Sequence, residues 1–173
     1  IKDIEKLVNE FSNFARMPRP ILKKINIKDL ISRNLDFANL SSKNKINFIN
    51  NSKDYFILGD GDQLNRVFMN LIKNSEESFL EKFKKNPNFK GNIDIEISDD
   101  NEYIVCRLTD NGPGIIDSKK VMTPYFTTKK TGSGLGLPIV NKIINEHSGK
   151  FLIKNKSKGE GTLIKILFPK SNA

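Results

Sequence analysis

The sequence predicts an α+β fold, a two-layer α/β sandwich in which helices cover one face of a mixed sheet of about five strands. Two stretches, 93–97 and 104–108, place apolar residues at every second position, as half-buried strands do. A third stretch, 63–83, repeats its apolar residues every three or four positions, which predicts the longest helix. The chain of 173 residues is long enough for one such domain, or for one domain with a fragment of another.

An amphipathic helix stub is expected ahead of this domain. Its apolar residues recur at 3-4-3 spacing, as in a helix that packs on another helix, and Pro18 and Pro20 end it. A helix of about four turns is not stable alone, so it needs a partner. We therefore assign residues 1–20 to a helix with its linker and 21–173 to the domain, with an ordinary docked N-terminal helix as the alternative. The apolar positions of the stub are Ile4, Leu7, Phe11 and Phe14.

The first half of the domain is expected to contain a short strand, a helix and two further strands within residues 25–58. The two strands, Ile46–Ile49 and Tyr55–Leu58, are joined by an Asn-Asn-Ser turn. The residues Gly59-Asp60-Gly61-Asp62 then supply the cap of the long helix. The apolar side of the first helix is predicted to comprise Leu30, Ile31, Leu35 and Phe37 to Leu40. The buried stripe of the long helix is predicted to comprise Leu64, Val67, Phe68, Leu71, Ile72, Ser75 and Phe79.

The second half is expected to close the sheet. After the strands of 93–97 and 104–108, a helix carries Leu135, Ile139, Ile143 and His147 on one line and ends at Ser148-Gly149. Strands Lys150–Asn155 and Thr162–Phe168 follow. The single cysteine, Cys106, excludes an internal disulfide and is expected to be a small buried residue.

Composition limits the classes of function. Hydrophobic residues make up 37% and charged residues 28%, with no apolar run of membrane-spanning length and no signal peptide. The first residue is Ile1 rather than Met, so we expect a piece of a longer protein. The formal charge is +9, but the lysines are dispersed and lack the interleaved aromatic residues of a nucleic-acid surface. We expect no nucleic-acid partner, and a basic surface that attracts an anionic nucleotide or an acidic protein.

The stretch from Asp110 to Leu137 has the character of a nucleotide site. Asp110-Asn111-Gly112-Pro113-Gly114-Ile115 places a carboxylate at a strand end, before two glycines that permit a tight turn and a close approach to a ligand. Gly132-Ser133-Gly134-Leu135-Gly136-Leu137 runs into an apolar helix, whose first turn offers N–H groups and a positive dipole end to an anion. The residues between them, including Pro124-Tyr125-Phe126-Thr127-Thr128-Lys129-Lys130, are expected to form a lid at about 111–133.

In order and spacing, these blocks resemble the first glycine box, the phenylalanine box and the second glycine box of the histidine-kinase ATP-binding domain (HATPase_c, the Bergerat fold). This domain shares a superfamily with gyrase, the ninety-kilodalton heat-shock chaperone and mismatch-repair ATPases. Asn70-Leu71-Ile72-Lys73-Asn74 resembles the asparagine box, and Gly159-Glu160-Gly161-Thr162 the last glycine box. The segment from Phe11 to Pro20 is similar to the end of the dimerisation and phosphoacceptor hairpin in nitrogen-regulation sensor kinases of the NtrY/NtrB kind.

The resemblance implies ATP and Mg²⁺ as ligands. Asp110 would accept from the exocyclic amine of adenine, and Asn74 would hold magnesium as a neutral oxygen donor. The alternative for the asparagines, the lid lysines and Glu77 is a solvated side chain. The alternative for Thr162 is an ordinary strand residue, and the alternative for Phe126 is a residue of a satellite core. The expected catalytic residues are Asn70 and Asn74, and the expected metal ligand is Asn74. The expected cofactor-binding residues are Asn70, Asn74, Glu77, Asp110, Gly112, Gly114, Ile115, Phe126, Thr128, Lys129, Lys130, Gly132, Ser133, Gly134, Leu135, Gly136, Leu137 and Thr162.

Two departures from the resembled patterns affect the chemistry. The gyrase-like branch has a glutamate that activates water at the position of Asn70, and asparagine cannot act as a general base. Many sensor kinases have a basic–aromatic pair near Glu77-Ser78, which this chain lacks. The only histidine, His147, lies in the last turn of a helix and is expected to be structural, so the phosphoacceptor should lie outside the chain.

The predicted function is that of the catalytic domain of a two-component sensor histidine kinase. Its expected partners are the histidine phosphoacceptor and dimerisation domain of the same protein, as a homodimer, and the receiver domain of a response regulator. A cytoplasmic position is expected, with the parent protein in the bacterial inner membrane. The alternatives are a nucleotide-gated interaction module without transfer activity, a gyrase-like ATPase and a serine kinase of the anti-sigma type.

Overall fold

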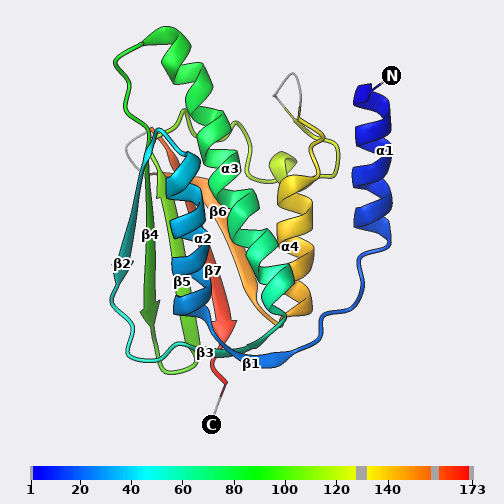
Figure 1. The fold of residues 1–173 in the computed structure, drawn as a ribbon, viewed down its shortest axis with the longest axis vertical. Helices are drawn as coiled ribbons and strands as arrows, with labels where there is room; N and C mark the ends of the chain where they lie inside the picture. Colours follow the sequence, from blue (N-terminus) through cyan, green and yellow to red (C-terminus); the bar gives the residue numbers. More distant parts are fainter. Residues whose placement is uncertain (1, 128–131, 157–159, 172–173) are drawn as a thin grey trace.

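A computed structural model describes residues 2–127, 132–156 and 160–171 of the chain. Its elements form two layers, with α2, α3 and α4 on one face of the main sheet and α1 at the side of the helical layer (Figure 1). None of the described helices is long and apolar enough to cross a membrane. In chain order, the elements are α1 (Lys2–Ala15), β1 (Lys23–Asn26), α2 (Ile27–Ser41), β2 (Lys45–Asn50), β3 (Phe56–Gly59), α3 (Gly61–Lys85), β4 (Asn92–Asp99), β5 (Tyr103–Asp110), the 3-10 helix η1 (Lys120–Met122), α4 (Gly136–Glu146), β6 (Lys150–Asn155) and β7 (Thr162–Pro169).

The main sheet of the described chain has five strands in the order β2-β4-β5-β7-β6. Strand β2 pairs parallel with β4, and the other neighbours are antiparallel. The predicted mixed two-layer sandwich is therefore confirmed. The strand predicted at Tyr55–Leu58 begins at Phe56 and pairs with β1 in a separate two-stranded sheet, so the Asn-Asn-Ser turn carries the chain from one sheet to the other.

Helix α3 is the central element of the helical layer. Asp60 caps its first turn, where the side chain accepts hydrogen bonds from the amides of Asp62 and Gln63 at 3.1 and 3.2 Å. Seven residues of α3 are buried, and they are the seven that the helical spacing predicted. Their burial against the apolar face of β4 and β5 holds α3 at the end of β5, where Asp110 lies.

The prediction for the apolar side of α2 is wrong at its C-terminal end. Phe37 and Leu40 are 64% and 86% exposed. Ala38, within the same predicted stretch, is buried as expected. Steps of four residues from Leu30 lead to Ala38 by way of Asn34, which was not predicted and is also buried. The amide of Asn34 donates to the Leu30 carbonyl and to Asn65 Oδ1, both at 2.8 Å, and these bonds offset the cost of burying a polar group.

His147 is a structural histidine, as predicted. It is 4% exposed, its Nδ1 donates to the Ile143 carbonyl at 2.7 Å, and its Nε2 accepts from the Asp60 amide at 2.9 Å. The ring therefore joins the end of α4 to the cap of α3. Cys106 is buried as well, and burial raises the pKa of its thiol to about 12.

Replacing His147 by Ala is expected to lower the free energy of unfolding by about 2 kcal/mol, because the Asp60 amide and the Ile143 carbonyl both lose their partner. Urea unfolding of the two proteins measures this change. A variant as stable as the parent chain would show that water replaces the imidazole at both groups.

A stability change with pH is expected from Asp99. Its carboxylate accepts from Lys170 Nζ at 2.7 Å, from the Lys53 amide at 2.9 Å and from the Ser52 hydroxyl at 2.9 Å, and these bonds lower its pKa to about 2. A lowered pKa stabilises the fold above the ordinary value of 3.8, and this stabilisation is lost as the pH falls towards 2. Urea midpoints should therefore fall between pH 4 and pH 2 less steeply in Asp99→Asn than in the parent chain. Equal slopes would contradict the assignment.

Candidate functional site

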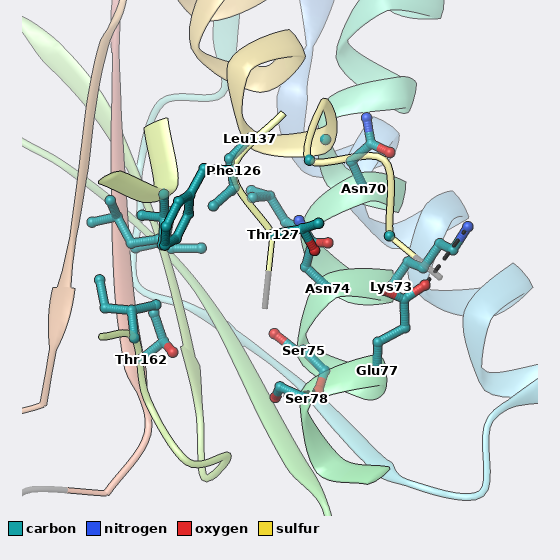
Figure 2. Close-up of a pocket in the computed structure, with 18 of the residues that line it drawn as sticks. Asn70, Lys73, Asn74, Ser75, Glu77, Ser78, Phe126, Thr127, Leu137 and Thr162 are labelled. Carbon is teal, nitrogen blue, oxygen red and sulfur yellow. Dashed lines mark hydrogen bonds and ion pairs between the residues drawn. The ribbon is translucent and has the colours of Figure 1, made fainter. Parts of the chain in front are cut away.

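A pocket of about 560 Å³ opens between α3, α4, the lid and the ends of β5 and β7, a size typical of small-molecule sites. Figure 2 shows α3 contributing one wall, with Asn70, Asn74, Ser75 and Ser78 along it, while Thr162 lies on the opposite side. The described residues predicted as cofactor-binding all line this pocket, except Gly112. They are Asn70, Asn74, Glu77, Asp110, Gly114, Ile115, Phe126, Gly132, Ser133, Gly134, Leu135, Gly136, Leu137 and Thr162.

Asp110 is a buried carboxylate at one end of the pocket, with 4% of its surface exposed. Its Oδ1 accepts from the amides of Gly112 and Thr162 at 2.9 and 3.1 Å. Its Oδ2 accepts from the Ser75 hydroxyl at 3.1 Å. Gly112 thus supports the carboxylate from outside the pocket. These three donors satisfy a buried charge and fix its direction, as a recognition group requires.

Two glycines are required by the backbone around this carboxylate and around the lid. Gly161 has φ +100°, and a Cβ there would lie 2.0 Å from the Asp110 carbonyl oxygen. Gly134 has φ +69°, and a Cβ there would lie 2.5 Å from the Tyr125 carbonyl carbon. Both positions combine a left-handed conformation with a close backbone approach, which only glycine accepts without strain.

The other end of the pocket is formed by the start of α4. Its N-cap residue, Leu135, makes no side-chain capping bond, and Ser133 Oγ accepts from the Leu135 amide at 3.4 Å. Ile139 is bonded to the Leu135 carbonyl, and Pro138 has no N–H. The amides of Gly136 and Leu137 therefore belong to an uncapped helix start that lines a pocket, which is a favourable position for an anion.

Asn70 and Asn74 lie one turn apart on α3 and face the same pocket (Figure 2). A Cβ on Gly136 would lie 3.4 Å from Asn74 Nδ2 and 3.7 Å from its Oδ1, so Asn74 is adjacent to the start of α4. Among the described residues there is no cluster of three or more His, Cys, Asp or Glu side chains that could hold a metal ion. A cation in this pocket would depend on amide oxygens and on the oxygens of its ligand, which is chemistry that suits Mg²⁺.

The segment that we predict to be a lid follows β5 directly after Asp110. Asn155 fastens its first part, because its Oδ1 accepts from the Ile115 amide at 2.6 Å and its Nδ2 donates to the Ile115 carbonyl at 2.8 Å. Further along, Tyr125 has φ 68° and its amide donates to the Gly134 carbonyl at 3.1 Å. Phe126 is half-buried and lines the pocket. The predicted Thr128, Lys129 and Lys130 lie outside the described residues.

The three glutamates of α3 differ in their surroundings, and Glu81 lines the pocket. Glu76 accepts a hydrogen bond from the Ser42 hydroxyl and is not among the pocket-lining residues. Glu77 lines the pocket and forms an ion pair with Lys73, at 3.8 Å between Oε1 and Nζ (Figure 2). Glu77 therefore lies in the pocket, and its role in cofactor binding stays a prediction.

Several residues that line the pocket, and one residue beside it, were not predicted from the sequence. Ser75 was predicted only as part of a buried stripe, although a hydroxyl within an apolar stripe is itself a signal that a polar partner lies opposite. Asn155 lies in a strand remote from the lid in sequence, and nothing in the local pattern indicates its bonds to Ile115. The apolar wall was also missed, because its members read as ordinary core residues: Ile139, Ile153 and Ile164.

Comparisons with known proteins agree with this geometry. A family model described as histidine kinase-, DNA gyrase B- and HSP90-like ATPase matches residues 59–172. An NtrY-like sensor histidine kinase of Rickettsia conorii is 33% identical over 169 residues, which cover 96% of this chain and 27% of that protein. The chain spans about a quarter of the length of the curated relatives that it matches.

Solved structures show the same fold. The catalytic domain of histidine kinase ThkA is 26% identical with a TM-score of 0.73, over 87% of this chain and 99% of that chain. Histidine kinase ThkA in complex with the response regulator protein TrrA is 21% identical with a TM-score of 0.78, over 98% of this chain and 48% of that chain. The predicted resemblance to histidine-kinase ATP-binding domains of the nitrogen-regulation kind is confirmed. The chain belongs to the histidine kinase-, DNA gyrase B- and HSP90-like ATPase family.

Proposed function

We propose that this chain is the catalytic domain of a sensor histidine kinase, which binds Mg-ATP and passes its γ-phosphoryl group to a histidine on a partner domain of the same protein. One observation carries this proposal: a single pocket has at one end a carboxylate that is held by three hydrogen bonds and whose Oδ2 can accept another, and at the other end an uncapped helix start. The first suits a base with an amino group, and the second suits phosphates.

In this proposal, different residues of the pocket bind the base and the phosphates of the nucleotide. Asp110 accepts from the adenine amine, with Thr162 behind it, and Asn70 lies beside the phosphates. The amides of the segment from Gly132 to Leu137 bind phosphate oxygens, and Lys129 and Lys130 of the lid neutralise their charge. Phe126 covers the nucleotide as the lid closes, and exclusion of water then protects the phosphoryl group from hydrolysis.

Asn74 is the magnesium ligand in this proposal. Its amide is adjacent to the helix start that would bind the phosphates, since a Cβ on Gly136 would lie 3.4 Å from Asn74 Nδ2. A bound Mg²⁺ would supply positive charge that offsets the negative charge on the phosphates during transfer. One neutral protein ligand is sufficient, since Mg²⁺ keeps several waters and takes the remaining oxygens from the nucleotide.

We expect the γ-phosphoryl group to be transferred to a histidine rather than to water, because Asn70 is not a general base and two nearby glutamates have other partners. Asn70 cannot remove a proton from water. Glu76 is engaged by the Ser42 hydroxyl, and Glu77 forms an ion pair with Lys73. Catalysis is then mainly placement and charge neutralisation, as in other phosphoryl transfers.

The N-terminal segment that contains α1 is the part of the chain that we connect to the proposed partner domain. We assign residues 1–20 to the end of the phosphoacceptor and dimerisation hairpin of a homodimeric parent protein. The linker is fixed to the cap of α3, since Gln63 Nε2 donates to the Pro18 carbonyl and the Ile21 amide donates to Asp60 Oδ2, both at 2.9 Å. A response regulator would receive the phosphoryl group from the histidine, and the parent protein is expected to be anchored in the inner membrane.

A nucleotide-gated interaction module is the second candidate. His147, the only histidine of the chain, is buried and bonded at both ring nitrogens, so the phosphoacceptor is not this residue in either function. Two measurements with a separately produced histidine-bearing hairpin distinguish the two functions. The first is the affinity of the chain for the hairpin with ATP, with ADP and without nucleotide. The second is analysis of the hairpin for phosphohistidine. A kinase domain modifies the hairpin, whereas a module changes its affinity with nucleotide and leaves the histidine unmodified.

A further inference from the structure

Ser75 forms a hydrogen bond that none of the assigned roles explains. It is 3% exposed within the apolar stripe of α3, and its hydroxyl donates to Asp110 Oδ2 at 3.1 Å. A helical serine commonly bonds back to a carbonyl of its own helix. Here the hydroxyl instead crosses from the helical layer to the end of β5 and joins the carboxylate that we assign to base recognition.

The hydrogen-bonding capacity of Asp110 is divided unequally between its oxygens. A carboxylate oxygen accepts about two hydrogen bonds, and Oδ1 already accepts two from the amides of Gly112 and Thr162. Oδ2 accepts one, from Ser75, and retains capacity for another. Both Asp110 and Ser75 line the pocket, so the remaining capacity of Oδ2 is available to a ligand.

The direction of the Ser75 bond follows from the charge state of its partner. An ionised carboxylate can only accept, so the single hydroxyl proton of Ser75 is committed to Oδ2. The lone pairs of Ser75 Oγ then add acceptors rather than donors to this end of the pocket. A ligand group that contacts Asp110 Oδ2 has to be a donor, since Oδ2 can only accept.

We propose that Ser75 is a positioning residue for nucleotide recognition: its hydroxyl holds Asp110 Oδ2 in place to accept from an amino group on the ligand's base. In this role Ser75 sets the preference for purines with an amino donor over purines with a keto acceptor. The inference deepens the proposed function and rests on adenine nucleotides binding in this pocket with the base at Asp110.

The test compares two nucleotides that differ only at the recognised group. Ser75→Ala removes the hydroxyl and is expected to weaken ATP binding about tenfold, the effect of one hydrogen bond to a charged group. The triphosphate of purine riboside lacks the amino group and should bind the variant and the parent chain equally. A merely structural role for Ser75 would instead weaken both nucleotides by the same factor.

Two further variants control for stability. Ser52→Ala removes another buried serine hydroxyl that donates to an aspartate, Asp99, remote from the pocket-lining residues. It should change thermal stability but leave the ratio of the two affinities unchanged. Ser75→Thr keeps the hydroxyl and should restore most of the preference for ATP over the purine riboside nucleotide.

The outcomes separate this inference from the function on which it rests. A selective loss of ATP affinity in Ser75→Ala, restored in Ser75→Thr, supports it. An ATP-to-purine-riboside ratio equal to that of the parent chain overturns the role of Ser75 and leaves the proposed function intact. A parent chain that binds neither nucleotide overturns both.

Discussion

Replacement of Asp110 by Asn is expected to weaken ATP binding by roughly 100-fold while the fold survives. The amides of Gly112 and Thr162 both donate to Oδ1, so the oxygen of the new amide must take that position. Its NH₂ group then takes the position of Oδ2, where the Ser75 hydroxyl can rotate to accept from it. The pocket therefore presents an N–H to the ligand where adenine also presents an N–H.

The same reversal predicts a gain for a different nucleotide. Inosine triphosphate carries a keto oxygen in place of the adenine amine, and Asp110→Asn should bind it more tightly than ATP. Calorimetric titration with both nucleotides measures the change, and a thermal unfolding midpoint within a few degrees of the parent value shows that the fold is intact. Asp99→Asn is the matched control, since Asp99 binds Lys170 and Ser52 and is not among the pocket-lining residues. Unchanged ATP affinity in Asp110→Asn would exclude Asp110 as the base-recognition residue.

Replacement of Asn74 by Ala is expected to abolish the dependence of ATP binding on magnesium. The amide of Asn74 lies beside Gly136 at the start of α4, where the phosphates are proposed to bind. Without this oxygen donor, Mg²⁺ should add little to the affinity, and the variant should bind ATP in Mg²⁺ no more tightly than the parent chain binds it in EDTA. Phosphoryl transfer should fall by at least about 100-fold, since the ion offsets charge in the transition state.

Titrations of ATP in Mg²⁺ and in EDTA test this prediction directly. Asn65→Ala is a suitable control, because Asn65 lies on the same helix but binds Asn34 rather than lining the pocket. A magnesium effect of parental size in Asn74→Ala would move the metal ligand to another residue.

Much of the fold could be predicted from periodicity because local sequence and burial agree in the central elements. In α3 the spacing of apolar residues alone gives the buried face, and in β4 and β5 strict alternation gives the strands that end at Asp110. The prediction of buried residues fails where contacts between distant parts of the chain determine which side chains are buried. Phe37 and Leu40 are apolar yet exposed, whereas the polar Asn34 is buried on the inward face of α2, where it forms a hydrogen bond with Asn65.

The candidate site shows the same division between local and long-range information. Asp110 and the glycines could be identified because strand ends and tight turns are local features. Thr162, 52 residues away in the chain, was expected beside Asp110 only from the family resemblance. Ser75, 35 residues away, could not be identified as a partner of Asp110. Asn155 is separated from Ile115 by 40 residues, and only the folded sheet brings this amide to the lid.

The destination of the γ-phosphoryl group tests the proposed function most directly. The chain is incubated with γ-labelled Mg-ATP and a separately produced phosphoacceptor hairpin, and the label is followed on the hairpin and in solution. The proposed function predicts acid-labile label on the hairpin histidine. Little free phosphate is expected, because Asn70 cannot act as a general base and activate water. Label released only as free phosphate, or tight ATP binding without any transfer, would contradict the histidine-kinase function.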